Sequence, residues 1–305
     1  MLRGVLLVFL GASSFGVLSS IVKLAYKDGF SLGEVTGVQA FFGTMLLWTI
    51  YFFQQKSKSV PRTKKAFKPK LRVILMGTST GLVSIFYYKC VQSVPASIAI
   101  LLLMQFTWMG VVLDMVFSRK FPSKLQTLSV IGVLLGTLLA GNVLHQGFEN
   151  IQLVGIFYGL LAALSYSCFL MINNRVGNQY PPALKSALML TGACILIFSI
   201  FPPVFLWNGS LGNGLLVFGI LLALFGTVIP PLFFAKGIPV VGLTLSSILS
   251  AAELPVAVFM SWFILNETVL GIQWLGVILI LAAIILPNAL KLLTKSSKLS
   301  QKVSV

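Results

Sequence analysis

Charged residues are scarce in this sequence, and acidic ones are the scarcest. Asp, Glu, Lys and Arg together make up 9% of the 305 residues, whereas apolar residues make up 57%. An average soluble domain is about one quarter charged. A chain with so little charge cannot cover a globular surface with polar groups, so the composition excludes a soluble enzyme.

Histidine and cysteine are also nearly absent. The one histidine, His145, leaves no histidine pair for a metal, and the three cysteines show no metal-ligand spacing. A Gly-rich phosphate-binding loop ending in Lys-Ser or Lys-Thr does not occur, so direct use of ATP is unsupported. We therefore expect no metal and no cofactor, and we do not expect an enzyme.

Ten stretches are apolar enough to cross a bilayer, which needs roughly 20 mostly apolar residues. They leave no room for a separate soluble domain, so we interpret the chain as one integral membrane unit. The split at Pro239, between the eighth and ninth stretches, is the least clearly marked. The approximate bounds are Gly4–Ala25, Gly33–Phe53, Val73–Val91, Ala96–Phe117, Leu125–Val143, Leu153–Asn173, Leu184–Trp207, Gly214–Ala235, Val240–Leu265 and Gly271–Leu290.

The charges that are present are strongly biased towards one sign. The chain has 22 Lys and Arg but only 6 Asp and Glu, a net charge of +16. In a soluble protein this excess would indicate nucleic-acid binding. In a membrane protein, basic residues mark the cytoplasmic side. Placing both termini in the cytoplasm leaves only Lys23, Lys27 and Lys89 outside, so we predict that orientation and no nucleic-acid partner.

The two halves of the chain resemble each other at a nearly constant spacing. Gly4–Gly16 and Gly155–Ser167, 151 positions apart, share a leading glycine and a small/polar/aromatic patch. Further on, a spacing of 147 pairs Gln126 with Gln273. Five spans per half is an odd number, so the second half enters the membrane from the opposite side, as an inverted repeat. We predict a first repeat at 1–146, a second at 147–290 and a basic cytoplasmic tail at 291–305.

The second half carries a distinctive series of motifs. A small-residue stretch, Gly242–Ala252, leads into Glu253-Leu254-Pro255-Val256. The turn Asn266-Glu267-Thr268 and the segment Gln273–Gly276 follow. These residues resemble the small-residue helix, Glu-x-Pro-Val kink, glutamate turn and Gln-x-x-Gly helix start of the EamA-type permeases of the drug/metabolite transporter superfamily.

The resemblance extends over essentially the whole chain, although Trp108 stands in the first half where the second has Pro255. It implies an all-α integral membrane protein of ten transmembrane helices, arranged as two inverted five-helix repeats around a central cavity. It also implies a secondary transporter of small organic metabolites that works by alternating access. Efflux of amino acids or related metabolites is the preferred hypothesis for its activity, with the proton as a candidate coupling ion.

The implied location is the bacterial cytoplasmic (inner) membrane, with a small-molecule substrate and membrane lipids as partners. A monomer and a homodimer are both compatible with the sequence. An integral-membrane enzyme or a passive channel with a similar helical scaffold remains the alternative. Saturable flux with counter-exchange would distinguish a carrier from a channel.

Glu253 is the main candidate for function, because ionisable residues inside a membrane are costly. It lies about 13 residues into the ninth stretch, roughly 20 Å at about 1.5 Å per residue. Pro255 cannot donate a backbone hydrogen bond and is expected to kink this helix. Glu253 is therefore a candidate for substrate binding and ion coupling; alternatively it stays protonated and supports the kink. Asp114 is the second ion-coupling candidate, although an interfacial salt bridge is the simpler interpretation.

Polar and aromatic residues in the spans are the other candidates for a solute site. The mirrored patches of the first and sixth stretches supply several of them. Ser and Thr in spans often bond their own helix backbone instead, and Gly11 and Gly16 fit small-residue helix packing. The predicted substrate-binding residues are Ser14, Phe15, Tyr88, Trp108, Ser165, Tyr166, Ser250 and Glu253.

Overall fold

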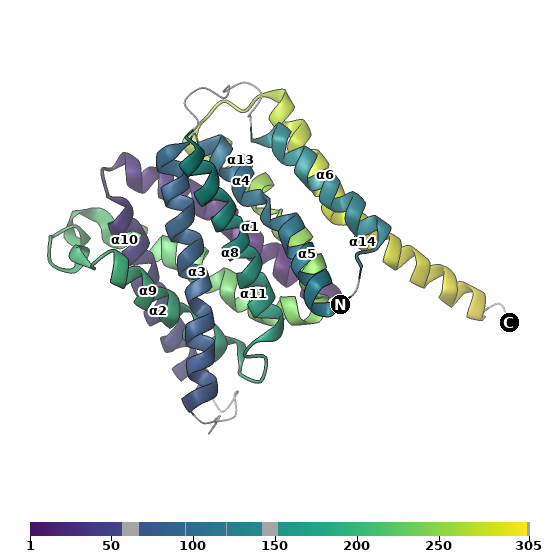
Figure 1. The fold of residues 1–305 in the computed structure, drawn as a ribbon, viewed down its shortest axis with the longest axis horizontal. Helices are drawn as coiled ribbons and strands as arrows, with labels where there is room; N and C mark the ends of the chain where they lie inside the picture. Colours follow the sequence, from purple (N-terminus) through teal and green to yellow (C-terminus); the bar gives the residue numbers. More distant parts are fainter. Residues whose placement is uncertain (57–66, 95, 120, 142–151, 304–305) are drawn as a thin grey trace.

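A computed structural model describes residues 1–56, 67–94, 96–119, 121–141 and 152–303 (Figure 1). Within these ranges the regular secondary structure is entirely helical, as predicted. The helices are α1 (Leu2–Lys27), α2 (Leu32–Lys56), α3 (Phe67–Ser93), α4 (Ala96–Met104), α5 (Phe106–Ser118), α6 (Lys124–Ala140), α8 (Leu153–Arg175), α9 (Pro182–Ile200), η1 (Val204–Leu206), η2 (Leu211–Leu215), α10 (Leu216–Leu222), η3 (Ala223–Val228), α11 (Ile229–Val241), α12 (Leu243–Ser250), α13 (Glu253–Leu265) and α14 (Gly271–Val303).

Eight helical segments in the described part of the chain are long and apolar enough to cross a membrane. Two shorter apolar helices, Lys124–Ala140 and Gly271–Pro287, correspond to the fifth and tenth predicted stretches. The protein is therefore a multi-pass membrane protein. The predicted boundary between the repeats, at residue 146, lies outside the described residues.

Two predicted span boundaries were wrong. The split between the eighth and ninth spans lies at Gly242, which has φ +85°, and Pro239 lies inside α11. Glycine adopts this positive φ without steric cost, so the chain turns there and not at the proline. The seventh span ends at Ile200, short of Trp207, because Pro202 and Pro203 follow and cannot continue the helical hydrogen bonds.

Two spans are each broken into a pair of short helices. Gln105 separates α4 from α5, and Ala251 and Ala252 separate α12 from α13. At the second break, the Ala251 carbonyl accepts from the Leu254 N–H. That carbonyl would otherwise bond the residue-255 N–H, which Pro255 lacks. The break thus lies directly before Glu253 and sets this residue at the start of α13.

The broken spans pack into two groups of helices. In the α1 group, α1 packs against α11, α12 and α13; in the α8 group, α8 packs against α3, α4 and α5. Helix α9 belongs to neither group and packs against α2 and against α3 of the α8 group. Helices α6 and α14 lie side by side at one edge of the bundle (Figure 1). Small residues allow this close packing, as is usual between membrane helices.

Matching local features recur 147 positions apart. Arg119 and Asn266 both end a helix in the left-handed conformation, with φ of 54° and 52°. The next helix in each half then begins with a glutamine that accepts a backbone hydrogen bond from the residue three positions earlier. These bonds run from Ser123 N to Gln126 Oε1, at 2.8 Å, and from Leu270 N to Gln273 Oε1, at 3.0 Å.

Candidate functional site

A cavity of about 550 Å³ lies among the broken spans. Its walls come mainly from the middle and end of α1, from α3, α4 and α8, and from α13, and single residues or pairs from α2, η3, α6 and α14 complete them. It reaches the end of the bundle that carries residues 266–270, where Lys23, Glu267 and Thr268 line it. We call this end the mouth. The volume lies within the range of about 300–1,000 Å³ that is typical of small-molecule sites.

Glu253 contributes a carboxylate to the cavity wall. The Tyr166 hydroxyl donates a hydrogen bond to its Oε2 at 3.4 Å. The Tyr166 ring in turn contacts Phe15 edge to face, with centroids 6.1 Å apart, and Phe106, with centroids 4.4 Å apart. An acidic group therefore lies at the inner part of a mainly aromatic and aliphatic cavity, where it can meet a cationic group or a proton.

Four of the eight predicted substrate-binding residues line the cavity: Phe15, Tyr88, Tyr166 and Glu253. The predicted serines are not part of its lining. Ser14 is buried and its hydroxyl donates to the Phe225 carbonyl at 2.7 Å. Ser165 is half-buried and Ser250 fully buried, both outside the lining.

Trp108 lies apart from the cavity. Its side chain is 39% exposed and lines a shallow apolar groove together with Phe157, Leu160 and Leu164. Its indole N–H donates to Gln105 Oε1 at 2.9 Å, beside the break between α4 and α5. The exposed apolar surface of a membrane protein faces lipid, so this position suits a lipid contact.

Asp114 lies at the end opposite the mouth and caps α12. Its Oδ2 accepts from the Thr244 N–H at 3.2 Å and from the Thr244 hydroxyl at 2.6 Å. Its Oδ1 accepts from the Ser118 hydroxyl at 2.7 Å, and Arg175 donates to that serine oxygen at 2.7 Å. A carboxylate at a helix N-terminus is favourable because it meets unpaired N–H groups and the positive end of the helix dipole.

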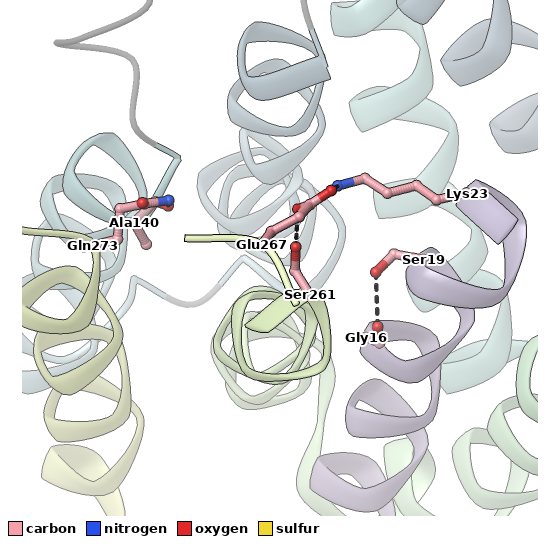
Figure 2. A network of polar contacts seen from close by, with 7 residues as sticks. All are labelled: Gly16, Ser19, Lys23, Ala140, Ser261, Glu267 and Gln273. Carbon is pink, nitrogen blue, oxygen red and sulfur yellow. Dashed lines mark hydrogen bonds and ion pairs between the residues drawn. The ribbon is translucent and has the colours of Figure 1, made fainter. Parts of the chain in front are cut away.

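An ion pair at the mouth was not predicted from the sequence, although both of the residues that form it were named there. Lys23 Nζ lies 3.1 Å from Glu267 Oε2, and the Ser261 hydroxyl also donates to Glu267 (Figure 2). The two charged side chains are about half exposed. Partial burial raises the pKa of the Glu267 carboxyl, but the hydrogen bonds from Ser261 and Lys23 outweigh this and hold the pKa below its usual value.

Gln273 occupies the same end of the molecule. Its Oε1 accepts from the Leu270 N–H at 3.0 Å. Its Nε2 donates to the Ala140 carbonyl at 3.2 Å, and Figure 2 shows these two residues side by side. It thereby caps α14 and ties it to the end of α6. The signal for this role was present in the sequence, since the glutamine opens the last helix in the motif that resembles the EamA-type permeases.

A serine motif in α3 bears on the enzyme alternative. Gly77-Thr78-Ser79-Thr80-Gly81 has the Gly-x-Ser-x-Gly spacing of a hydrolase nucleophile, which requires a sharp turn from a strand to a helix. Here the segment lies within α3, and the Ser79 hydroxyl donates to the Met76 carbonyl at 2.9 Å. The described residues contain no cluster of three His, Cys, Asp or Glu side chains able to hold a metal.

A helical membrane-spanning bundle around a solute-sized cavity is the architecture of a polytopic membrane protein that binds a small solute, as a transporter does. The EamA-like transporter family model matches residues 2–142 and 153–288, and the chain belongs to this family. It is also similar to the threonine/homoserine exporter RhtA of Salmonella typhimurium strains SL1344 and LT2. Identity to each is 26% over 283 residues, which cover 92% of this chain and 89% of the relative. A solved crystal structure shares the fold with a TM-score of 0.74 and 15% identity, covering 94% of this chain and 98% of that one.

Proposed function

We propose that the protein is a secondary transporter that exports amino acids or related small metabolites, with the central cavity as its solute site. Membership of the EamA-like family and the similarity to a threonine/homoserine exporter support metabolite export. The observation that carries the proposal is the carboxylate of Glu253 in a mainly apolar cavity of about 550 Å³. A carboxylate in such a site forms strong, charge-assisted hydrogen bonds with an ammonium group.

We further propose that the ten helices form two inverted five-helix repeats, with bounds near 1–146 and 147–290. Equivalent packing contacts in the α1 and α8 groups support this. A Cβ atom built on Gly4 lies 3.1 Å from Val240 Cβ, and one on Gly155 lies 2.8 Å from Ser93 Cβ. The glycines are 151 positions apart and their partners 147 apart, the two spacings found in the sequence.

A second pair of contacts obeys the same two spacings. The Ser167 hydroxyl donates to the Phe106 carbonyl at 3.1 Å. Counterpart positions in the other half are Gly16 and Glu253, where a Cβ on Gly16 would lie 2.5 Å from the Glu253 carbonyl oxygen. Helices of unrelated halves have no reason to meet at matched residues, so these contacts favour a genuine repeat.

The proposed orientation places both termini in the cytoplasm of a bacterium, with the mouth of the cavity outside. The distribution of basic residues supports this orientation, because 19 of the 22 then lie on the cytoplasmic side. The cavity in this state is open outwards, and transport proceeds by alternating access. Inverted repeats of this kind can exchange conformations and so expose one site to each side in turn.

Transport itself is tested with purified protein in liposomes loaded with radiolabelled threonine or homoserine. We expect saturable efflux and stimulation by unlabelled amino acid on the opposite side. A passive channel would show neither saturation nor counter-exchange. Equal flux in protein-free liposomes, or none for any amino acid tested, would contradict amino-acid export.

Proton coupling through Glu253 is tested with Glu253→Gln. We expect the stimulation of flux by a pH gradient to fall tenfold or more in this variant, because its amide cannot release or take up a proton. Glu267→Gln is the matched control, since it removes a carboxylate at the exposed mouth of the same cavity. Unchanged pH-dependent flux in the Glu253 variant would rule out coupling through this residue.

A further inference from the structure

The end of the cavity away from the mouth is closed by contacts between the α1 group and the α8 group. Phe169 of α8 meets Phe234 of α11, with ring centroids 5.9 Å apart. Gly110 of α5 packs so tightly on α12 that a Cβ on it would overlap the hydroxyl of Ser247. Each contact joins one helix of the α8 group to one helix of the α1 group.

The repeat spacings assign each of these residues a counterpart in the other half. The counterparts of the first pair are Leu18 and Tyr87, at spacings of 151 and 147. Those of the second pair are Ala257 and Ile100, both at a spacing of 147. All four counterparts line the cavity. They too join the α1 group, through Leu18 and Ala257, to the α8 group, through Tyr87 and Ile100.

Contacts inside the two groups have matching contacts in the other half of the chain, whereas the two contacts between the groups do not. The contacts of Gly4 and Gly16 within the α1 group have matching partners within the α8 group, at Gly155 and Ser167. The halves therefore agree in their internal packing and differ at these two pairs of contacts between the groups. A third contact between the groups, from Tyr26 of α1 to Tyr88 of α3 with ring centroids 6.4 Å apart, is present with the mouth open. Movement of two rigid groups against each other is sufficient to explain this difference.

We propose that the mouth closes by bringing Ala257 against Ile100 and Leu18 against Tyr87, while their counterpart contacts at the opposite end separate. This gate rests on the alternating access of the proposed function and names the residues that perform it. The four side chains are apolar or aromatic, so their contact removes apolar surface from water and stabilises the closed mouth.

Asp114 makes the two ends unequal. Its hydrogen bonds to Thr244 join α5 to α12, and thus link the two groups at the closed end. The counterpart of Asp114 is Ser261, which carries no charge and bonds Glu267 near the mouth. Among the residues that the structure describes, the Asp114 link has no counterpart at the mouth, so it favours the state with the open mouth.

The gate is tested by disulfide cross-linking of Ile100→Cys/Ala257→Cys in liposomes, with the native cysteines Cys90, Cys168 and Cys194 replaced by alanine. A disulfide requires Cα atoms about 4.4–6.8 Å apart, so its formation reports that the two helices have met. We expect the cross-link to form under mild oxidation and to lower amino-acid flux tenfold or more. Reduction of the disulfide should restore the flux. Flux in the reduced variant also shows that the variant is folded.

Two further cysteine pairs complete the comparison. Gly110→Cys/Ser247→Cys should cross-link in the state with the open mouth and block flux as well. A Cβ on Gly110 lies 2.9 Å from Ser247 Cβ, and a disulfide needs about 3.5 Å, so α5 and α12 must separate by roughly 0.6 Å to accommodate it. Gly132→Cys/Ala283→Cys joins α6 to α14, where a Cβ on Gly132 lies 3.0 Å from Ala283 Cβ. Neither helix belongs to the moving groups, so this control should cross-link without loss of flux.

Cross-linking of Ile100 to Ala257 should also become several-fold faster when Asp114 is replaced by Ala, because the link that favours the open mouth is removed. An unchanged rate would overturn the role of Asp114. Absence of the Ile100–Ala257 cross-link, in protein where the other two pairs form, would overturn the gate. If the Ile100→Cys/Ala257→Cys variant does not fold, Leu18→Cys/Tyr87→Cys tests the same gate. Cross-links are detected by mass spectrometry, so the gate is decided even if no amino acid proves to be a substrate.

Discussion

Replacing Gly16 with alanine perturbs a tight crossing of α1 with α13, next to Glu253. A Cβ atom at this position would lie 2.5 Å from the Glu253 carbonyl oxygen, 2.7 Å from Val256 Cβ and 2.9 Å from Ala257 N. Ordinary carbon contacts are about 3.5–4.0 Å long. Two of the three atoms belong to the α13 backbone and cannot turn aside as a flexible side chain would, so the helices must separate.

Two effects of opposite sign determine how much Gly16→Ala changes the free energy of unfolding. Alanine is favoured over glycine in a helix interior by about 1 kcal/mol. Overpacking of a well-packed interior typically costs about 1–3 kcal/mol, and backbone clashes belong at the upper end of that range. The clash therefore wins by about 1–2 kcal/mol, which lowers the melting temperature by about 2–4 °C in a chain of this size.

Thermal unfolding in detergent, followed by size-exclusion chromatography or intrinsic fluorescence, measures this shift. Gly271→Ala is the matched control, because a Cβ at Gly271 meets no atom within 4 Å. We expect the control to melt within about 1 °C of the parent protein. A Gly16→Ala variant that melts at or above the parent temperature would refute the close crossing of α1 and α13.

Two further substitutions give distinct outcomes. Trp108→Ala should leave the KM for the solute unchanged, because the side chain lies in an outer groove away from the cavity; a tenfold rise in KM, measured in liposomes, would place it in the solute site. Glu267→Gln should lower the melting temperature by about 2 °C or less, since half-exposed ion pairs contribute only up to about 1 kcal/mol. The Glu267 pKa is depressed below its ordinary 4.5, so this difference should be constant from pH 6 to 8 and shrink only as pH falls below 4.5. A difference that vanishes at pH 6 would contradict the depressed pKa.

The long apolar runs predicted most of the fold, because a bilayer demands long helices whatever their packing. The helix ends were harder to predict, since they depend on local backbone geometry. Pro239 resembles a helix break in the sequence, yet it is tolerated in the last turn of α11. Gly242 ends this helix because its positive φ redirects the chain. The sequence contains many glycines and does not show which of them adopts a positive φ.

The side chains that face the cavity could be predicted only in part. Phe15 and Tyr166 stand at matched places in the two halves, and the repeat drew attention to both. The orientation of Trp108 depends on how α5 is rotated against α8, which one helix sequence does not reveal. Serines gave the weakest signal, because a hydroxyl such as that of Ser14 can be satisfied by a carbonyl of a neighbouring helix, here Phe225, as well as by a solute.

Asp114 shows why a repeat is more informative than either of its halves. Considered alone, a carboxylate near a span end and close to basic residues is adequately explained by an interfacial salt bridge. In the structure it caps α12, a helix that begins 129 positions later, and its counterpart Ser261 caps nothing equivalent. Under the proposed repeat and alternating access, departures from the repeat identify the groups that distinguish one conformational state from the other. Because a transporter with two identical halves would have no preferred state, we infer that the unmatched polar residues set the resting conformation, and that the matched apolar ones permit the exchange.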